Sequence, residues 1–266
     1  MPQPALVDSH CHLDFPDFAG EIDAVVARAA AAGVGRMVTI CTRLRQEPQA
    51  RAIAEAEAAV FYAAGTHPMQ AAEEPLASVE DLVRIAAHPK MVGIGETGLD
   101  YHYTAESAAI QAESLRIHVE AARQTGLPLI IHARDADADI ARILAEEHAA
   151  GRFSCVMHCF TASAALAETA LALGFYLSIS GIATFRTAGS LRDIFAAAPR
   201  DRLLVETDSP YLAPLPHRGR RNEPAYVADT VRGVAPALGL EPAELAALTS
   251  ANFDRLFAKA AAWSPA

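Results

Sequence analysis

Lysine is scarce in this sequence of 266 residues. The chain has two lysines, Lys90 and Lys259, and its lysines and arginines together number 22 against 32 aspartates and glutamates, which gives a formal net charge of −10. A protein that binds long stretches of duplex by neutralising their phosphates normally has the opposite balance. The composition therefore excludes an extended nucleic-acid-binding surface and allows only local contact, at a strand end or a single phosphodiester.

Cysteine is also rare, and long apolar runs are missing. The four cysteines (Cys11, Cys41, Cys155 and Cys159) lack CxxC spacing, so we expect buried, reduced thiols rather than a disulfide framework. No apolar segment approaches the ~20 residues that span a bilayer, and the first residues lack the basic and apolar regions of a secretory signal. We therefore expect a cytoplasmic protein without membrane contact, and no obligate protein partner is evident.

No Ser/Gly-rich linker, low-complexity tract or charge block divides the chain, so we expect a single domain over residues 1–266. Hydrophobic residues make up 52% of the sequence and charged residues 20%. This composition provides a large core and excludes global disorder.

Short runs rich in β-branched or aliphatic residues alternate with Ala-rich stretches that have apolar residues at helical spacing. Strands are predicted near 5–9, 37–41, 60–65, 91–95, 128–132, 155–159, 175–180 and 203–207. Helical stretches between the strands include 21–32, 106–124, 136–149 and 164–173, and two further helices are predicted after the last strand, at 222–237 and 241–262. Eight strand-then-helix units predict an α/β fold, a (β/α)₈ TIM barrel. An open doubly wound sheet is the alternative, because alternation alone does not show that the sheet closes.

Six side chains that can bind a metal stand at the downstream ends of these runs: His10, His12, Glu96, His132, His158 and Asp208. Parallel strands bring their carboxyl ends to one face of a barrel, so we expect these side chains to meet there. Four imidazoles and two carboxylates suit two divalent cations. Two such cations indicate hydrolysis at phosphorus or at a carbonyl carbon.

Alternation along an extended strand predicts that His10 and His12 project to the same side, as two ligands on one rigid strand end. Glu96 could bridge two cations with its two oxygens, and Gly95 and Gly98 beside it would allow a close backbone approach. The alternative for Glu96 is a structural ion pair.

His132 and His158 could complete a second cation site. Asp208 would coordinate the first cation and hold or deprotonate the attacking water. Because Ser-Pro follows it, a helix N-cap is the alternative.

His67, just before Pro68, has no place among the six ligands. It could hydrogen-bond a scissile phosphate, move a proton or stabilise the turn. Asp208, Glu96 and His67 are thus the candidate catalytic residues.

Arginines that could bind an anionic substrate occur in two places: Arg134 follows His132, and three more lie in the Pro- and Arg-rich segment 211–224, namely Arg218, Arg220 and Arg221. An arginine fork matches phosphate oxygens. A solvated loop is the alternative for the second group.

The two lysines bear on the bridging ligand. Lys90 precedes the fourth predicted strand and Lys259 lies in the last predicted helix, so neither is expected at the face that carries the ligands. The bridge then has to be a carboxylate, and Glu96 is available. This argues against a lysine-bridged amidohydrolase or phosphotriesterase. His88, His118 and His148 fall in or beside helical segments, and we interpret them as structural or surface residues.

Seven motifs, in order along the chain, resemble those of the TatD family of metal-dependent deoxyribonucleases. They are VDSHCHLD at 7–14, GTHP at 65–68, GETGLDY at 95–101, HAR at 132–134, HCFT at 158–161, ETDSPYL at 206–212 and RGRRNEP at 218–224. The resemblance implies a TIM barrel of the amidohydrolase superfamily with two divalent metal ions (Mg²⁺, Mn²⁺ or Zn²⁺). It also implies cleavage of DNA, commonly as a 3′→5′ exonuclease on single-stranded ends, with a proposed role in DNA repair.

Carried over by position, the resemblance implies that one ion is held by His10, His12 and Asp208, the other by His132 and His158, with Glu96 bridging. It implies a substrate-phosphate contact for His67. The chain departs from the family at Met69, where many relatives carry a further histidine. A small-molecule amidohydrolase or esterase of the same superfamily is the alternative function, and a non-catalytic binding protein is a more distant one. The lysine-free ligand face and the Arg-rich segment favour phosphate.

Overall fold

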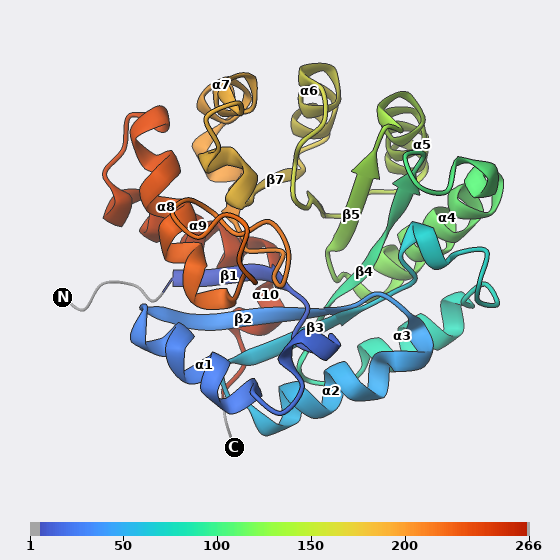
Figure 1. Ribbon diagram of the computed structural model, residues 1–266. Coiled ribbons are helices and arrows are strands. Elements are labelled where there is room, and N and C mark those ends of the chain that lie inside the picture. Colours follow the sequence, from blue (N-terminus) through green and yellow to red (C-terminus); the bar gives the residue numbers. More distant parts are fainter. Residues whose placement is uncertain (1–5, 265–266) are drawn as a thin grey trace.

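The computed structural model describes residues 6–264, which form a barrel of eight parallel strands with helices around the outside (Figure 1). Neighbouring strands pair in chain order from β1 to β8. The strands are β1 (Leu6–Cys11), β2 (Val34–Cys41), β3 (Val60–Ala64), β4 (Met91–Asp100), β5 (Leu129–Arg134), β6 (Cys155–Met157), β7 (Tyr176–Ile179) and β8 (Leu203–Val205). The predicted TIM barrel is confirmed.

The α-helices follow the strands and cover them. They are α1 (Ile22–Ala31), α2 (Glu47–Ala56), α3 (Val79–Ala86), α4 (Ala108–Thr125), α5 (Asp137–Ala150), α6 (Ala164–Ala172), α7 (Gly189–Ala197), α8 (Val227–Val234), α9 (Pro242–Leu256) and α10 (Ala258–Ala261). The predicted final helix is interrupted at Phe257, whose backbone leaves the helical region and whose ring is buried against Phe253, with centroids 4.6 Å apart. No helix within residues 6–264 is long and apolar enough to cross a membrane.

The first and last strands close the barrel, which rules out the open doubly wound sheet. Cys11 forms a parallel bridge with Ser209. The His12 amide donates to the Ser209 carbonyl at 2.8 Å, and the Asp208 amide donates to the His10 carbonyl at 2.9 Å. The closure therefore runs through the residues that carry three of the predicted ligands.

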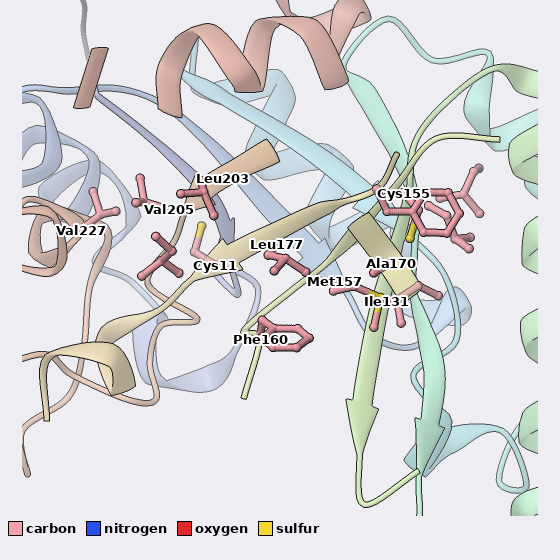
Figure 2. Close-up of a cluster of buried hydrophobic side chains, with 14 of the residues drawn as sticks. Cys11, Ile131, Cys155, Met157, Phe160, Ala170, Leu177, Leu203, Val205 and Val227 are labelled. Carbon is pink, nitrogen blue, oxygen red and sulfur yellow. The ribbon is translucent and has the colours of Figure 1, made fainter. Parts of the chain in front are cut away.

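Side chains that point outward from the strands pack against the helices. Figure 2 shows part of this layer, in which Ile131, Met157 and Leu177 lie in successive strands near Ala170 of α6. All four cysteines are free thiols, and Cys11 and Cys155 belong to this layer. The apolar outward positions of each strand thus account for the attachment of the helical shell.

Side chains that point inward change from apolar to polar along the strands. The apolar inward-facing residues include Val7, Ile130, Val156, Tyr176 and Leu204. Together with Phe253, Phe257 and Trp263 they form a second hydrophobic core. The residue two positions after each of these five, in the same strand or just beyond its end, is polar. These polar residues are Ser9, His132, His158, Ser178 and Glu206. Because alternate residues share one face of a strand, the barrel interior is hydrophobic at its amino end and polar at its carboxyl end.

Both lysines lie at the amino end of the strands. Lys90 Nζ donates to the backbone carbonyl oxygens of Glu57 (2.7 Å) and Val60 (3.1 Å) and to that of Ala54. Lys259 Nζ donates to the carbonyl of Ala86 at 2.7 Å. The two lysine amines therefore bind backbone oxygens at the end of the barrel away from the predicted ligands.

Candidate metal centre

All six predicted ligands meet at the carboxyl end of the barrel. The first cluster joins the end of β1 to the segment after β8. His10 Nε2 lies 3.3 Å from His12 Nε2 and 3.7 Å from Asp208 Oδ1, and His12 Nε2 lies 3.3 Å from the same oxygen. One nitrogen from each ring and one carboxylate oxygen are close enough to hold a metal ion.

Glu96 lies between this cluster and the other imidazoles. Its Oε2 is 3.3 Å from His10 Nε2, whereas its Oε1 is 2.7 Å from His158 Nε2 and 3.1 Å from His132 Nδ1. The glutamate is almost fully buried. Its two oxygens therefore face two different sets of imidazoles.

The donor set of the first cluster fits a cation. The Nδ1–H of His12 donates to the Ile40 carbonyl at 3.0 Å, which leaves its Nε2 lone pair directed at the cluster. Burial alone would lower the pKa of His12, but the hydrogen bond and charge of Asp208 raise that pKa to about 9. Burial opposes ionisation of Asp208 too, yet the neighbouring histidines hold its pKa below the usual value. The cluster thus stabilises added positive charge, which a metal ion would supply.

A buried acid lies beside each of the remaining two imidazoles. The Nε2–H of His132 donates to Asp100 Oδ2 at 3.0 Å, so Nδ1 is the nitrogen available to a metal. His158 Nδ1 lies 3.4 Å from Glu206 Oε1, which accepts a 2.6 Å hydrogen bond from the Cys159 amide. Two further groups of side chains could hold an ion. One group is His67, Glu96 and His132, and the other is His10, His158 and Glu206.

Sequence reasoning missed Glu206 and Asp100, although strand alternation contained a signal for both. Glu206 is two residues after the inward-facing Leu204, and it is fully buried. Asp100 is four residues after Glu96 in β4, which places both on one face of that strand. Glu206 Oε2 has no hydrogen-bond partner within the described residues, which is consistent with a polar ligand beside it.

A third buried acid, Asp8 of β1, connects the first strand to Thr207, which follows the last strand. Its Oδ1 accepts from the Thr207 amide at 2.9 Å, and its Oδ2 accepts from the Thr207 hydroxyl at 2.6 Å.

Asp208, which follows Thr207, has φ +55°, in the left-handed region. No helix begins after it before Pro224 in the described chain. The N-cap alternative for Asp208 is therefore wrong, and the left-handed turn directs its carboxylate toward His12.

Two glycines bring β4 against β5, as their positions beside Glu96 predict. At Gly98, with φ +142°, an added Cβ would lie 2.0 Å from the His132 carbonyl oxygen. At Gly95, with φ +130°, it would lie 2.6 Å from the Ile130 carbonyl oxygen. A side chain at either position would separate the strands that carry Glu96 and His132.

His67 follows β3 and has one of the roles predicted for it, the stabilisation of the turn. Its Nδ1 accepts a 3.2 Å hydrogen bond from the Met69 amide, which stabilises the turn. In the neutral ring the proton is therefore on Nε2, which lies 3.4 Å from Glu96 Oε1. Burial lowers the pKa of His67. The ring is placed as a hydrogen-bond donor at the edge of the centre.

His118 of α4 supports the segment that carries His67. Its Nδ1–H donates to the Ser114 carbonyl at 2.7 Å, and its Nε2 accepts from the Thr66 amide at 3.1 Å. Burial lowers the pKa of His118 from its ordinary value of 6.5 to about 4. Between these pH values the unfolded chain binds more protons at His118 than the folded chain does. The contribution of neutral His118 to the free energy of unfolding is therefore complete above pH 6.5 and is lost as the pH falls toward 4.

We expect His118→Gln, which cannot titrate, to flatten the pH dependence of stability. The neutral imidazole of His118 should account for about 3 kcal/mol between pH 6.5 and 4 in the parent protein. Urea unfolding of both proteins at several pH values, with metal chelated, measures the free energy of unfolding. The titration of the other histidines contributes equally to both proteins, so the difference between the two curves reports His118. Parallel curves for the two proteins would contradict the prediction.

A cavity of about 1350 Å³ opens over the centre. Arg134 lines it, together with Glu96, His132 and Asp208. The other predicted anion binders are exposed and lie outside the lining: Arg218, Arg220 and Arg221. Arg221 pairs with Glu21 at 3.1 Å. Of the four arginines, Arg134 is therefore the one that the structure places beside the centre, and a substrate role for the others stays a prediction.

A TIM barrel that gathers imidazoles and buried carboxylates at the carboxyl ends of its strands is the architecture of a metal-dependent hydrolase. The profile of the family described as TatD related DNase matches residues 7–258. The chain belongs to the TatD family of metal-dependent hydrolases, as its motifs predict.

Individual relatives cover almost the whole chain. The metal-dependent hydrolase YcfH of Escherichia coli K12 is 46% identical over 257 residues, which cover 95% of each protein. The 3′-5′ ssDNA/RNA exonuclease TatD of Citrobacter rodentium is 33% identical over 257 residues, covering 95% of this chain and 97% of that protein. The crystal structure of YjjV, a TatD homologue of E. coli K12, superposes with a TM-score of 0.89 at 30% identity, covering 96% of this chain and 98% of that chain.

Proposed function

We propose that this hydrolase cleaves phosphodiester bonds at the ends of single-stranded DNA, as a 3′→5′ exonuclease that uses two divalent cations, Mg²⁺, Mn²⁺ or Zn²⁺. The observation that carries the proposal is the position of Glu96, whose two oxygens face separate sets of imidazoles. The name of the Citrobacter relative supports nucleic-acid ends as the substrate. The cytoplasmic location and the role in DNA repair stay predictions from the sequence.

Each candidate residue has a role that follows from its environment. The cations, when bound, supply positive charge for activating water and for neutralising the phosphate. Asp208, ionised at neutral pH, accepts the proton of the attacking water. The Nε2–H of His67 donates to a phosphate oxygen, and Arg134 at the cavity wall orients the phosphodiester.

The acidic surface agrees with an enzyme that acts on ends. With a net charge of −10, the protein gains little from counterion release along a duplex. Within the cavity, positive charge is available at the proposed cation sites and at the lining arginines Arg43 and Arg134. A terminal nucleotide needs only such a local site.

Incubation of metal-reconstituted protein with end-labelled single-stranded DNA tests the proposal. We expect stepwise shortening of the strand, and its loss in His132→Ala, because that substitution removes a nitrogen 3.1 Å from Glu96. His148→Ala is the matched control, since His148 packs against Phe175 on the outside of the barrel. An inert oligonucleotide together with turnover of a small amide, lactone or carboxylic ester would instead favour the alternative function.

A further inference from the structure

Two tyrosine rings are exposed at the mouth of the cavity. Within residues 6–264, three large hydrophobic side chains are exposed, and two of them are Tyr103 (57%) and Tyr211 (54%). Both tyrosines line the cavity that contains Glu96 and Asp208. Exposed aromatic rings beside a reaction centre indicate a ligand with flat apolar surfaces that can cover them.

The backbone of each tyrosine is fixed to an acid of the metal centre. The Tyr103 amide donates to Asp100 Oδ1 at 2.8 Å, and the other oxygen of that carboxylate accepts from His132. The Tyr211 amide donates to the Asp208 carbonyl at 3.0 Å. Each tyrosine is thus three residues after an acid of the centre, with its backbone held and its ring exposed.

The two rings approach the centre from opposite sides. Tyr103 follows β4 and Tyr211 follows β8, which are four strands apart in the eight-stranded barrel and so lie on opposite sides of it. The Arg134 guanidinium lies 5.1 Å from the centroid of the Tyr103 ring. The Tyr211 ring meets the edge of Phe15, 6.1 Å away, and Phe15 stacks on His12. Aromatic rings combined with arginine are the means by which proteins bind unpaired nucleotides.

We infer that Tyr103 and Tyr211 are stacking platforms for the unpaired bases on the two sides of the scissile phosphate. The inference rests on the proposed function and deepens it, because it gives the enzyme a physical reason to select single strands. Bases within a duplex stack on one another and cannot offer their faces to a protein ring, whereas unpaired bases can. Stacking does not depend on base identity, so the enzyme should shorten strands of any sequence.

Steady-state kinetics on a single-stranded oligonucleotide test the inference with Tyr103→Ala and Tyr211→Ala. We expect each substitution to raise KM roughly 5- to 100-fold with little change in kcat, since stacking holds bases and takes no part in bond breaking. The matched variants Tyr103→Phe and Tyr211→Phe keep the ring and should retain the parent KM. Both side chains are exposed, so the thermal unfolding midpoint should not move in any of the four variants.

A strand with abasic sites at its last positions supplies the complementary measurement. The parent protein should be at least as poor on this strand as either alanine variant is on the intact strand, and neither alanine substitution should cause a further loss on the abasic strand. Unchanged KM in the alanine variants, or an equal loss on intact and abasic strands, would overturn the stacking role while leaving the nuclease intact. Failure of the parent protein to shorten any strand would instead overturn the proposed function.

Discussion

Glu96→Gln is expected to abolish metal-dependent activity while leaving the barrel folded. Glutamine has the shape of glutamate but lacks its charge, and it can present only one carbonyl oxygen to a cation. The substitution therefore removes the negative charge that stands between His10 and His158. We expect metal affinity to fall about 100-fold or more and turnover to fall on the order of 10³-fold. Titration calorimetry and elemental analysis after dialysis measure the first effect, and end-labelled DNA measures the second.

Glu47→Gln is a suitable control. Glu47 is also a buried glutamate, but it accepts a 2.9 Å hydrogen bond from the Tyr62 hydroxyl and has no contact with the predicted ligands. Its glutamine variant should bind metal as the parent does. If Glu96→Gln retained the parent stoichiometry and affinity, the bridging role of Glu96 would have to be abandoned.

Lys90→Met should give the opposite result, a large loss of stability with an unchanged metal centre. Lys90 Nζ is buried and donates to several backbone oxygens, among them those of Glu57 and Val60, and it lies 4.6 Å from the centroid of the Trp263 ring. Methionine fills similar space but leaves those oxygens without a donor. We expect a loss of about 3 kcal/mol, which corresponds to roughly 6–12 °C in the unfolding midpoint.

Urea unfolding and calorimetry measure that loss, and metal content at 25 °C reports the centre. Arg152→Met is the control, because Arg152 is exposed and loss of a surface charge changes stability by only about 0.5 kcal/mol. A Lys90→Met protein as stable as the parent would show that the backbone oxygens are equally well solvated without the amine. A loss of metal in this variant would contradict the separation of the two ends of the barrel.

The meeting of the six predicted ligands at one end of the barrel could be predicted because it depends on local rules. His10 and His12 share a side of β1 through alternation, and His132 and His158 follow inward-facing apolar residues, Ile130 and Val156. Strand order along the chain then places these ends on one face. Each step uses the period of a strand and the topology of the fold, both of which are present in the sequence.

The supporting contacts could not be predicted, because their partners are distant in the sequence. Asp8 bonds Thr207 across the closure of the barrel, and Arg221 pairs with Glu21 instead of lining the cavity. Nothing near Arg221 in the sequence distinguishes a substrate-binding arginine from one that is already paired. The left-handed turn at Asp208 was likewise not predicted, since few residues other than glycine adopt this conformation and no residue type requires it.

The cluster of His10, His12 and Asp208 has a consequence for biosynthesis, because Asp208 lies far downstream of the two histidines in the sequence. Proteins are made from the amino terminus, so a ribosome-bound chain that has not yet released β8 has the two imidazoles without their carboxylate. In such a nascent chain the first cluster is incomplete, so a cation held there as proposed would be captured only after the segment that follows β8 has joined β1.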